Sequence, residues 1–104
     1  MPNPTITKEQ FKELGYKQTH LKMEDENNTW SVYYVKTINP DYYFDEISIQ
    51  WFCGTERYSI YRNTKNIRNI PLFEGFLRTI DDLKYIEQLF DLSRFYDIKY
   101  EYLG

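Results

Sequence analysis

Residues 79–91 contain the one long apolar stripe at helical spacing in this chain. The apolar side chains recur at steps of three and four, as on one face of an α-helix, and they are Ile80, Leu83, Ile86, Leu89 and Phe90. The polar residues between them, Glu87 included, are expected on the solvent side. Thr79 suits the N-cap, with two aspartates in the first turn. Such a stripe needs a partner surface, so we predict that this helix packs across a sheet.

The residues before this helix alternate between apolar and polar side chains, which is typical of strands with one buried face. The alternation predicts strands at residues 16–24, 30–38, 46–53 and 57–62, with residues 63–69 forming a loop. In the third strand one set of side chains should face the helix, namely Ile47, Ile49, Trp51 and Cys53. Residues 70–77 contain Pro71 and Gly75, so they form either a short edge strand or the approach to the helix. Residues 96–102 alternate again and predict a half-exposed strand.

The start of the chain predicts a short helix over residues 8–14. Thr7 and Gln10 are spaced as in a capping box, where each side chain bonds the backbone of the other residue. Ile6 and Phe11 stand where a hydrophobic staple places its two apolar residues. Gly15 follows as a left-handed terminator. Residues 1–5, with two prolines, are expected to be a loose end.

A length of 104 residues fits one domain, and 19% aromatic residues favour a core of large rings. The chain has no alanine, the best helix former, whereas tyrosine, isoleucine and phenylalanine are abundant. We therefore predict a single α+β domain over residues 1–104. Its antiparallel meander of four to five strands carries a helix from the C-terminal half on one face, and a short N-terminal helix precedes it.

The chemistry-bearing residues are few, so we predict no enzyme activity, no metal and no cofactor. Zinc takes three or four Cys, His or carboxylate ligands, whereas this chain has one cysteine, Cys53, and one histidine, His20, on different predicted strands. The glycines match no phosphate-binding loop. One cysteine, no apolar leader and no run of about 18 apolar residues favour a cytoplasmic protein that does not enter the membrane.

Residues 57–72 carry a formal charge of +4, whereas the whole chain carries −3. Cations interleaved with aromatic rings are the ingredients of single-stranded nucleic-acid binding, in which rings stack on bases and cations follow phosphates. The candidate residues are Arg57, Tyr58, Tyr61, Arg62, Lys65 and Arg68. The two tyrosines should point to opposite faces of their strand, which weakens this alternative. A solvated basic surface is the simpler interpretation.

The chain has 11 tyrosines, so several must lie on the surface. Tyrosine and arginine are the common anchors of protein interfaces. Our main prediction is therefore a small, non-catalytic protein that binds a protein partner through surface tyrosines, with candidates Tyr33, Tyr61, Tyr96, Tyr100 and Tyr102. A C-terminal edge strand would also offer backbone groups for self-association. Frequent asparagine and lysine fit an AT-rich genome, and with it an accessory or inhibitory role in a phage or mobile element.

Overall fold

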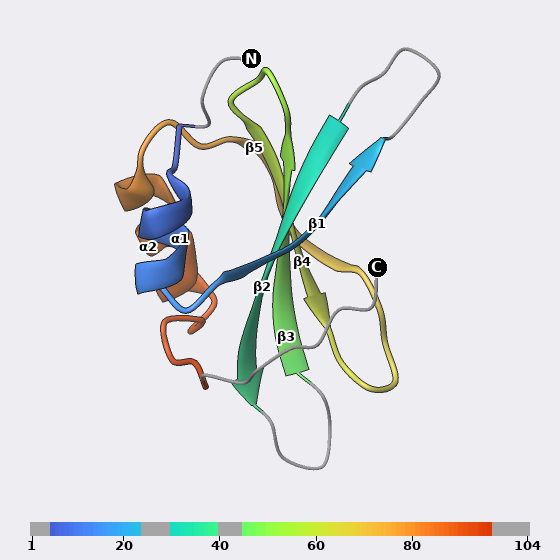
Figure 1. Ribbon diagram of the computed structural model, residues 1–104. Helices are drawn as coiled ribbons and strands as arrows, with labels where there is room; N and C mark the ends of the chain where they lie inside the picture. The colour runs from blue at the N-terminus through green and yellow to red at the C-terminus, as the bar shows by residue number, and fades with distance from the viewer. Residues whose placement is uncertain (1–4, 24–29, 40–44, 97–104) are drawn as a thin grey trace.

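The computed structural model describes residues 5–23, 30–39 and 45–96, which form two helices and five strands (Figure 1). The elements in chain order are α1 (Lys8–Glu13), β1 (Lys17–Met23), β2 (Trp30–Asn39), β3 (Asp45–Phe52), β4 (Arg57–Asn63), β5 (Ile70–Phe76) and α2 (Ile80–Leu89). Each strand pairs antiparallel with the next, giving the sheet order β1-β2-β3-β4-β5. The predicted α+β meander is confirmed, and residues 70–76 are a true edge strand.

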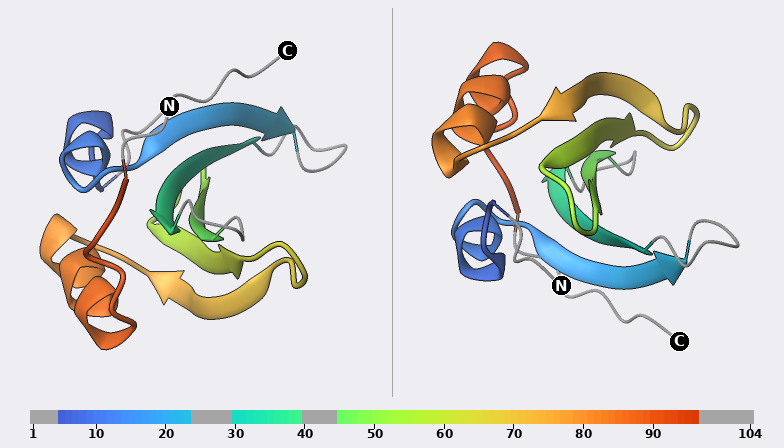
Figure 2. Two further views of the ribbon diagram at one scale, coloured as in Figure 1. Left: turned by 90° about the horizontal axis from the view of Figure 1, so that it is seen from below. Right: turned by 90° about the horizontal axis from the view of Figure 1, so that it is seen from above.

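The sheet is bent into an arch, with β1 and β5 at its two ends and both helices on one side (Figure 2). The core lies between the sheet and the helices. It is built from aliphatic and aromatic side chains of both layers: Ile6, Phe11, Tyr16, Val32, Tyr34, Ile47, Ile49, Trp51, Tyr58, Ile60, Leu77, Leu83, Ile86 and Leu92. The prediction for β3 is confirmed, because Ile47, Ile49 and Trp51 are buried there and Cys53 packs against them.

Helix α1 forms for the local reasons that its sequence indicates. The Thr7 hydroxyl accepts from Gln10 N at 3.1 Å, and Thr7 N donates to Gln10 Oε1 at 2.9 Å, which completes the capping box. Ile6 and Phe11 are both buried. Gly15 ends the helix with a φ of +93°. The helix is thereby held against the sheet through its aromatic residue.

Two features of the C-terminal third differ from the sequence predictions. Glu87, expected to face solvent, is buried, whereas Leu89 and Phe90 of the predicted sheet-facing stripe are exposed. Tyr96 forms a single bridge, in which its N donates to Thr37 O at 2.8 Å. The rest of the predicted strand at 96–102 lies outside the described residues, and so do residues 1–4 of the predicted loose end.

Candidate functional site

Apolar side chains of β5 and α2 line an open groove of about 490 Å³. Its lining residues are Leu72, Phe73, Phe76, Leu77, Arg78, Asp82, Tyr85, Ile86, Leu89 and Phe90, and we refer to this site as the apolar groove. Four of them are large hydrophobic side chains that remain strongly exposed: Phe76 at 65%, Tyr85 at 62%, Leu89 at 62% and Phe90 at 41%. Exposed apolar side chains gathered at one place mark binding surfaces more often than exposed ones scattered singly.

The apolar groove exists because the stripe of α2 runs past the part of the sheet that it covers. Leu83 and Ile86 reach the core, whereas Leu89, one turn later, points into the groove. Tyr85 lies four residues before Leu89, so the two side chains are neighbours on one helix face. This pair was missed by the sequence prediction, and the i, i+4 spacing of Tyr85 and Leu89 is the signal that could have found it.

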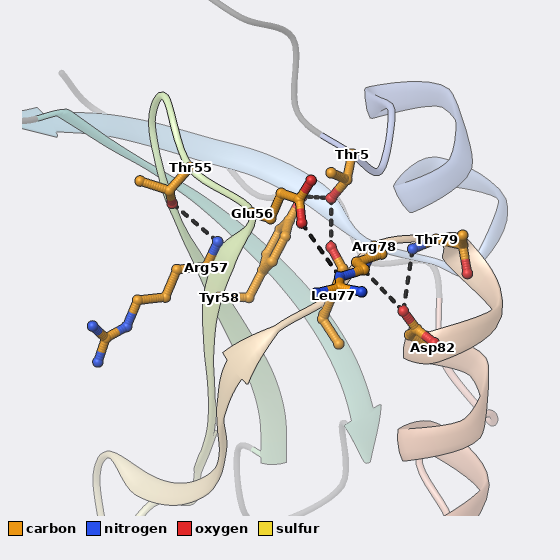
Figure 3. A network of polar contacts seen from close by, with 9 residues as sticks. All are labelled: Thr5, Thr55, Glu56, Arg57, Tyr58, Leu77, Arg78, Thr79 and Asp82. Atoms are coloured by element: carbon orange, nitrogen blue, oxygen red, sulfur yellow. Dashed lines mark hydrogen bonds and ion pairs between the residues drawn. The ribbon is translucent and has the colours of Figure 1, made fainter.

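A network of polar contacts fixes the turn from β5 into α2 (Figure 3). The Thr5 hydroxyl donates to Leu77 O at 2.6 Å and lies 3.1 Å from the hydroxyl of Tyr58, a fully buried residue. At the helix start, Asp82 Oδ2 accepts from Arg78 N at 2.9 Å and from Thr79 N at 3.3 Å. The turn that joins the strand wall and the helix wall of the apolar groove is therefore held by hydrogen bonds.

The β5 wall of the apolar groove also has an open edge. Leu77 N donates to Glu56 O at 3.1 Å, so these two residues form a hydrogen-bonded pair. The next pair along the two strands, Arg57 and Phe76, is then a non-bonded pair. Bonded and non-bonded pairs alternate in an antiparallel ladder, so the backbone groups of Phe76 and Glu74 point away from β4. No other strand of residues 5–23, 30–39 and 45–96 pairs with that edge.

A second hollow lies on the sheet face opposite the helices. It measures about 270 Å³ and is lined by Tyr33, Ser48, Gln50, Tyr61 and Asn69, and we refer to it as the polar pocket. Two of the five predicted interface tyrosines, Tyr33 and Tyr61, therefore meet at one site. Both are half-buried.

The other predicted interface tyrosines do not join the polar pocket. Tyr96 is 45% exposed, and its backbone N donates to Thr37 O. Thr37 lies two residues past Val35, the residue of β2 that pairs with the first residue of β1. Tyr100 and Tyr102 lie outside the described residues.

The cations of the basic segment, residues 57–72, lie in different surroundings. Arg57 forms an ion pair with Glu74 and lies over the Phe52 ring. Arg62 donates Nε and Nη2 to the two carboxylate oxygens of Asp45 at 3.0 and 2.7 Å. Hydrogen bonding to Asp45 raises the pKa of Arg62. Arg57 and Arg62 therefore both have carboxylate partners on neighbouring strands.

The remaining cations of the segment, Lys65 and Arg68, are exposed on the loop between β4 and β5. Tyr58 is a core residue with no exposed surface, so it is unavailable to stack on a base. Tyr61 alone of the two tyrosines reaches the outer face of the sheet.

A charged cluster is also buried beneath the helices. Glu87 Oε2 accepts from Lys36 Nζ and, at 3.0 Å, from the Tyr16 hydroxyl. Burial lowers the pKa of Lys36, although the contact with Glu87 opposes that shift. Burial, followed by the charge of Glu87, raises the pKa of Tyr16. At most 2% of each of these three residues is exposed, so we interpret the cluster as structural.

The described residues contain no group of three or more His, Cys, Asp or Glu side chains that could hold a metal ion. Burial raises the pKa of the Cys53 thiol, which favours its protonated form. Within the described ranges, no helix combines the length and apolarity that crossing a membrane requires.

Comparison with known proteins gives no relative from which a function could be carried over. No protein-family model, curated protein or solved structure matches this chain. The apolar groove and the polar pocket are therefore the two candidate functional sites of this chain.

Proposed function

We propose that this chain is a non-catalytic binding domain that takes up an extended segment of a partner protein along β5. The observation that carries the proposal is the group of four exposed apolar side chains in the apolar groove, next to an open strand edge. Burial of apolar surface supplies about 25 cal/mol per Å², so covering this group is a substantial source of binding energy.

The open edge of β5 favours a partner segment in extended conformation over a helical one. Glu74 and Phe76 present backbone donors and acceptors to solvent, and an added strand satisfies both kinds of group at once. A helix has already bonded its own backbone groups, so it would leave this edge unpaired. Alternate side chains of an added strand point to one face. On the groove side they can pack against Tyr85 and Leu89.

The same edge disfavours pairing with a second copy of itself. Pro71 cannot donate a backbone hydrogen bond, and Glu74 places a charged side chain on the strand. Proline and charge on an edge strand are devices that limit self-pairing. A second copy would bring a second proline and a second glutamate to the same edge, whereas a partner strand without them can pair better. The proposed partner is therefore a different protein, met in the cytoplasm, where the single cysteine favours placing this chain.

Selection of peptides from a random 12-residue library tests the proposal. The selected peptides should share apolar residues at every second position. Leu89→Glu should weaken their binding at least ten-fold, because it places a charge in the apolar groove. Gln88→Glu, which adds the same charge one residue away outside the lining, should leave binding unchanged.

Amide hydrogen exchange supplies the second readout. A bound strand should slow exchange at Glu74 and Phe76, whose amides point to the open edge, and change Tyr58 little. Peptides with apolar residues at steps of three and four, or slowed exchange confined to another surface, would contradict strand addition.

A further inference from the structure

The polar pocket is lined by two tyrosines from the strands on either side of β3. Tyr33 lies on β2 and pairs with Gln50, whereas Tyr61 lies on β4 and pairs with Ser48, so β3 runs between the two tyrosines. Neighbouring strands are about 4.8 Å apart and residues rise about 3.4 Å, which puts the two tyrosine backbones roughly 12 Å apart. Two successive ring–ring contacts span about 9–14 Å. The spacing fits one planar ring between the two side chains.

The floor and rim of the polar pocket supply hydrogen-bonding groups. Gln50 and Ser48 form the floor, and Gln50 Nε2 donates to Ser31 Oγ at 3.1 Å, which holds the amide in a fixed orientation. Asn69 adds a second amide at the rim. Amide and hydroxyl side chains can both donate and accept, as recognition of the edge of a nucleobase requires.

The loop that ends at Asn69 brings positive charge to the same rim. Arg68 is adjacent to Asn69 and exposed, and the loop between Asn63 and Asn69 contains no acidic residue. Asn69 N donates to Asn63 Oδ1 at 2.7 Å, so the end of the loop is tied back to β4. Arg57 and Arg62 are paired with carboxylates, whereas Arg68 is exposed next to Asn69, so Arg68 brings a positive charge to the rim of the polar pocket.

We propose that the polar pocket binds an unpaired nucleobase between the rings of Tyr33 and Tyr61, with the phosphate of that nucleotide at Arg68. The ligand is a free nucleotide or a nucleotide of a single strand, which share this chemistry. The site goes beyond the proposed protein-binding function, because the polar pocket and the apolar groove have no lining residue in common. Either function can fail without the other.

Fluorescence anisotropy and calorimetry with defined ligands test this site. The probes are a 12-nucleotide poly(U) strand, a poly(dT) strand, UMP, AMP and a 12-base-pair duplex, all in 50 mM salt. At least one single strand or mononucleotide should bind. Binding of a mononucleotide identifies a nucleotide site, whereas binding of the strands alone identifies a single-strand site. The duplex should bind at least ten-fold more weakly than the strand, since its bases are already stacked and paired.

Paired variants assign the binding to the polar pocket. Tyr61→Ala should weaken binding at least ten-fold, because stacking of one base is lost, whereas Tyr61→Phe keeps the ring and should stay within three-fold. Arg68→Ala should reduce the salt slope for a single strand by about 0.7, which corresponds to one phosphate contact. Arg78→Ala removes an exposed arginine that lines the apolar groove, away from the polar pocket, and should leave that slope unchanged.

Three results would overturn the nucleobase site. They are no binding of any single strand or mononucleotide, equal binding of duplex and single strand, and unchanged binding by a folded Tyr61→Ala variant. Thermal melting checks that the variants fold. Tyr85→Ala in the apolar groove should bind nucleotides as the parent does.

Discussion

Lys36 and Glu87 form an ion pair inside the core, with 0% and 2% of their side chains exposed. The pair joins β2 to α2 across 51 residues of sequence. Tyr16 donates to the same carboxylate, and the Lys36 ammonium lies 4.6 Å from the centre of the Tyr16 ring. A charge at this depth is tolerated because three groups satisfy one another.

Removal of one charge should destabilise the protein strongly. Glu87→Gln leaves the Lys36 ammonium buried without its countercharge, so the free energy of unfolding should fall by about 3 kcal/mol in urea denaturation. Tyr16→Phe, which removes one neutral donor, should cost about 1 kcal/mol. The double variant Lys36→Met, Glu87→Leu should lose less than the sum of its two single variants. Additive losses would show that the two charges do not interact.

The burial of Glu87 was beyond a local reading of the sequence. Periodicity places Glu87 beside Ile86 at the edge of the apolar stripe, and a glutamate there is ordinarily solvated. Its partners lie 51 and 71 residues earlier in the chain, and no spacing rule joins them. Helix α1 was predictable because its cap, staple and terminator all lie within ten residues.

Alkaline pH should unfold the protein through its buried tyrosines. Burial raises the pKa of Tyr16 and of Tyr58, and it raises the pKa of Tyr34 to about 12. The unfolded chain releases these protons near pH 10, whereas the folded protein keeps them. The stabilising contribution of the three tyrosines to the free energy of unfolding is therefore fully present below pH 10 and is lost as the pH rises above it. The loss is up to about 1.4 kcal/mol per pH unit for each tyrosine. Urea denaturation from pH 8 to pH 12 measures it.

Lys36 contributes with the opposite sign. Its lowered pKa makes the folded protein release that proton before the unfolded chain does, so this group increases stability as pH rises toward 10.5. Tyr34→Phe should flatten the decline between pH 10 and pH 12 by up to about 1.4 kcal/mol per unit. An unchanged decline in the Tyr34→Phe variant would mean that burial of Tyr34 is not the cause.

The two candidate sites show which parts of function the sequence could indicate. Tyr33 and Tyr61 were selected by residue type, but their meeting depends on β3 pairing with both β2 and β4. Local alternation gives the face of each side chain and leaves the register open. Prediction of the apolar groove would also require the path of the turn between β5 and α2, because only this turn brings Phe76 and Leu89 to the same site.

Two neighbouring aspartates should differ in their effect on α2. Asp82 accepts from Arg78 N and Thr79 N, whereas Asp81 shares the first turn and the favourable position near the helix dipole. Asp82→Ala should lower the free energy of unfolding by about 1 kcal/mol, as loss of a cap does. Asp81→Ala should cost less than about 0.5 kcal/mol. Equal losses in thermal or urea unfolding would mean that the charge alone, and not the hydrogen bonds, stabilises the helix start.

Two glycines with positive φ allow the cost of backbone strain to be measured separately from the cost of a packing clash. Gly15 has a φ of +93° and Gly54 a φ of +84°, so alanine at either position should cost about 1–2 kcal/mol in backbone strain. A Cβ at Gly15 would lie 2.3 Å from the Phe95 ring, whereas at Gly54 nothing lies within 4 Å. Gly15→Ala must therefore also displace Phe95, which lines a cavity of about 190 Å³ together with Gly15 and Tyr16.

We expect Gly15→Ala to lower the free energy of unfolding by at least about 1 kcal/mol more than Gly54→Ala, because overpacking adds to the strain. Adding Phe95→Ala to Gly15→Ala should cost less than Phe95→Ala costs in the parent, since the clash disappears with the ring. Urea denaturation of Gly15→Ala, of Phe95→Ala and of the double variant measures this coupling. If the two glycine variants lose equal stability, Phe95 does not pack against Gly15 in solution.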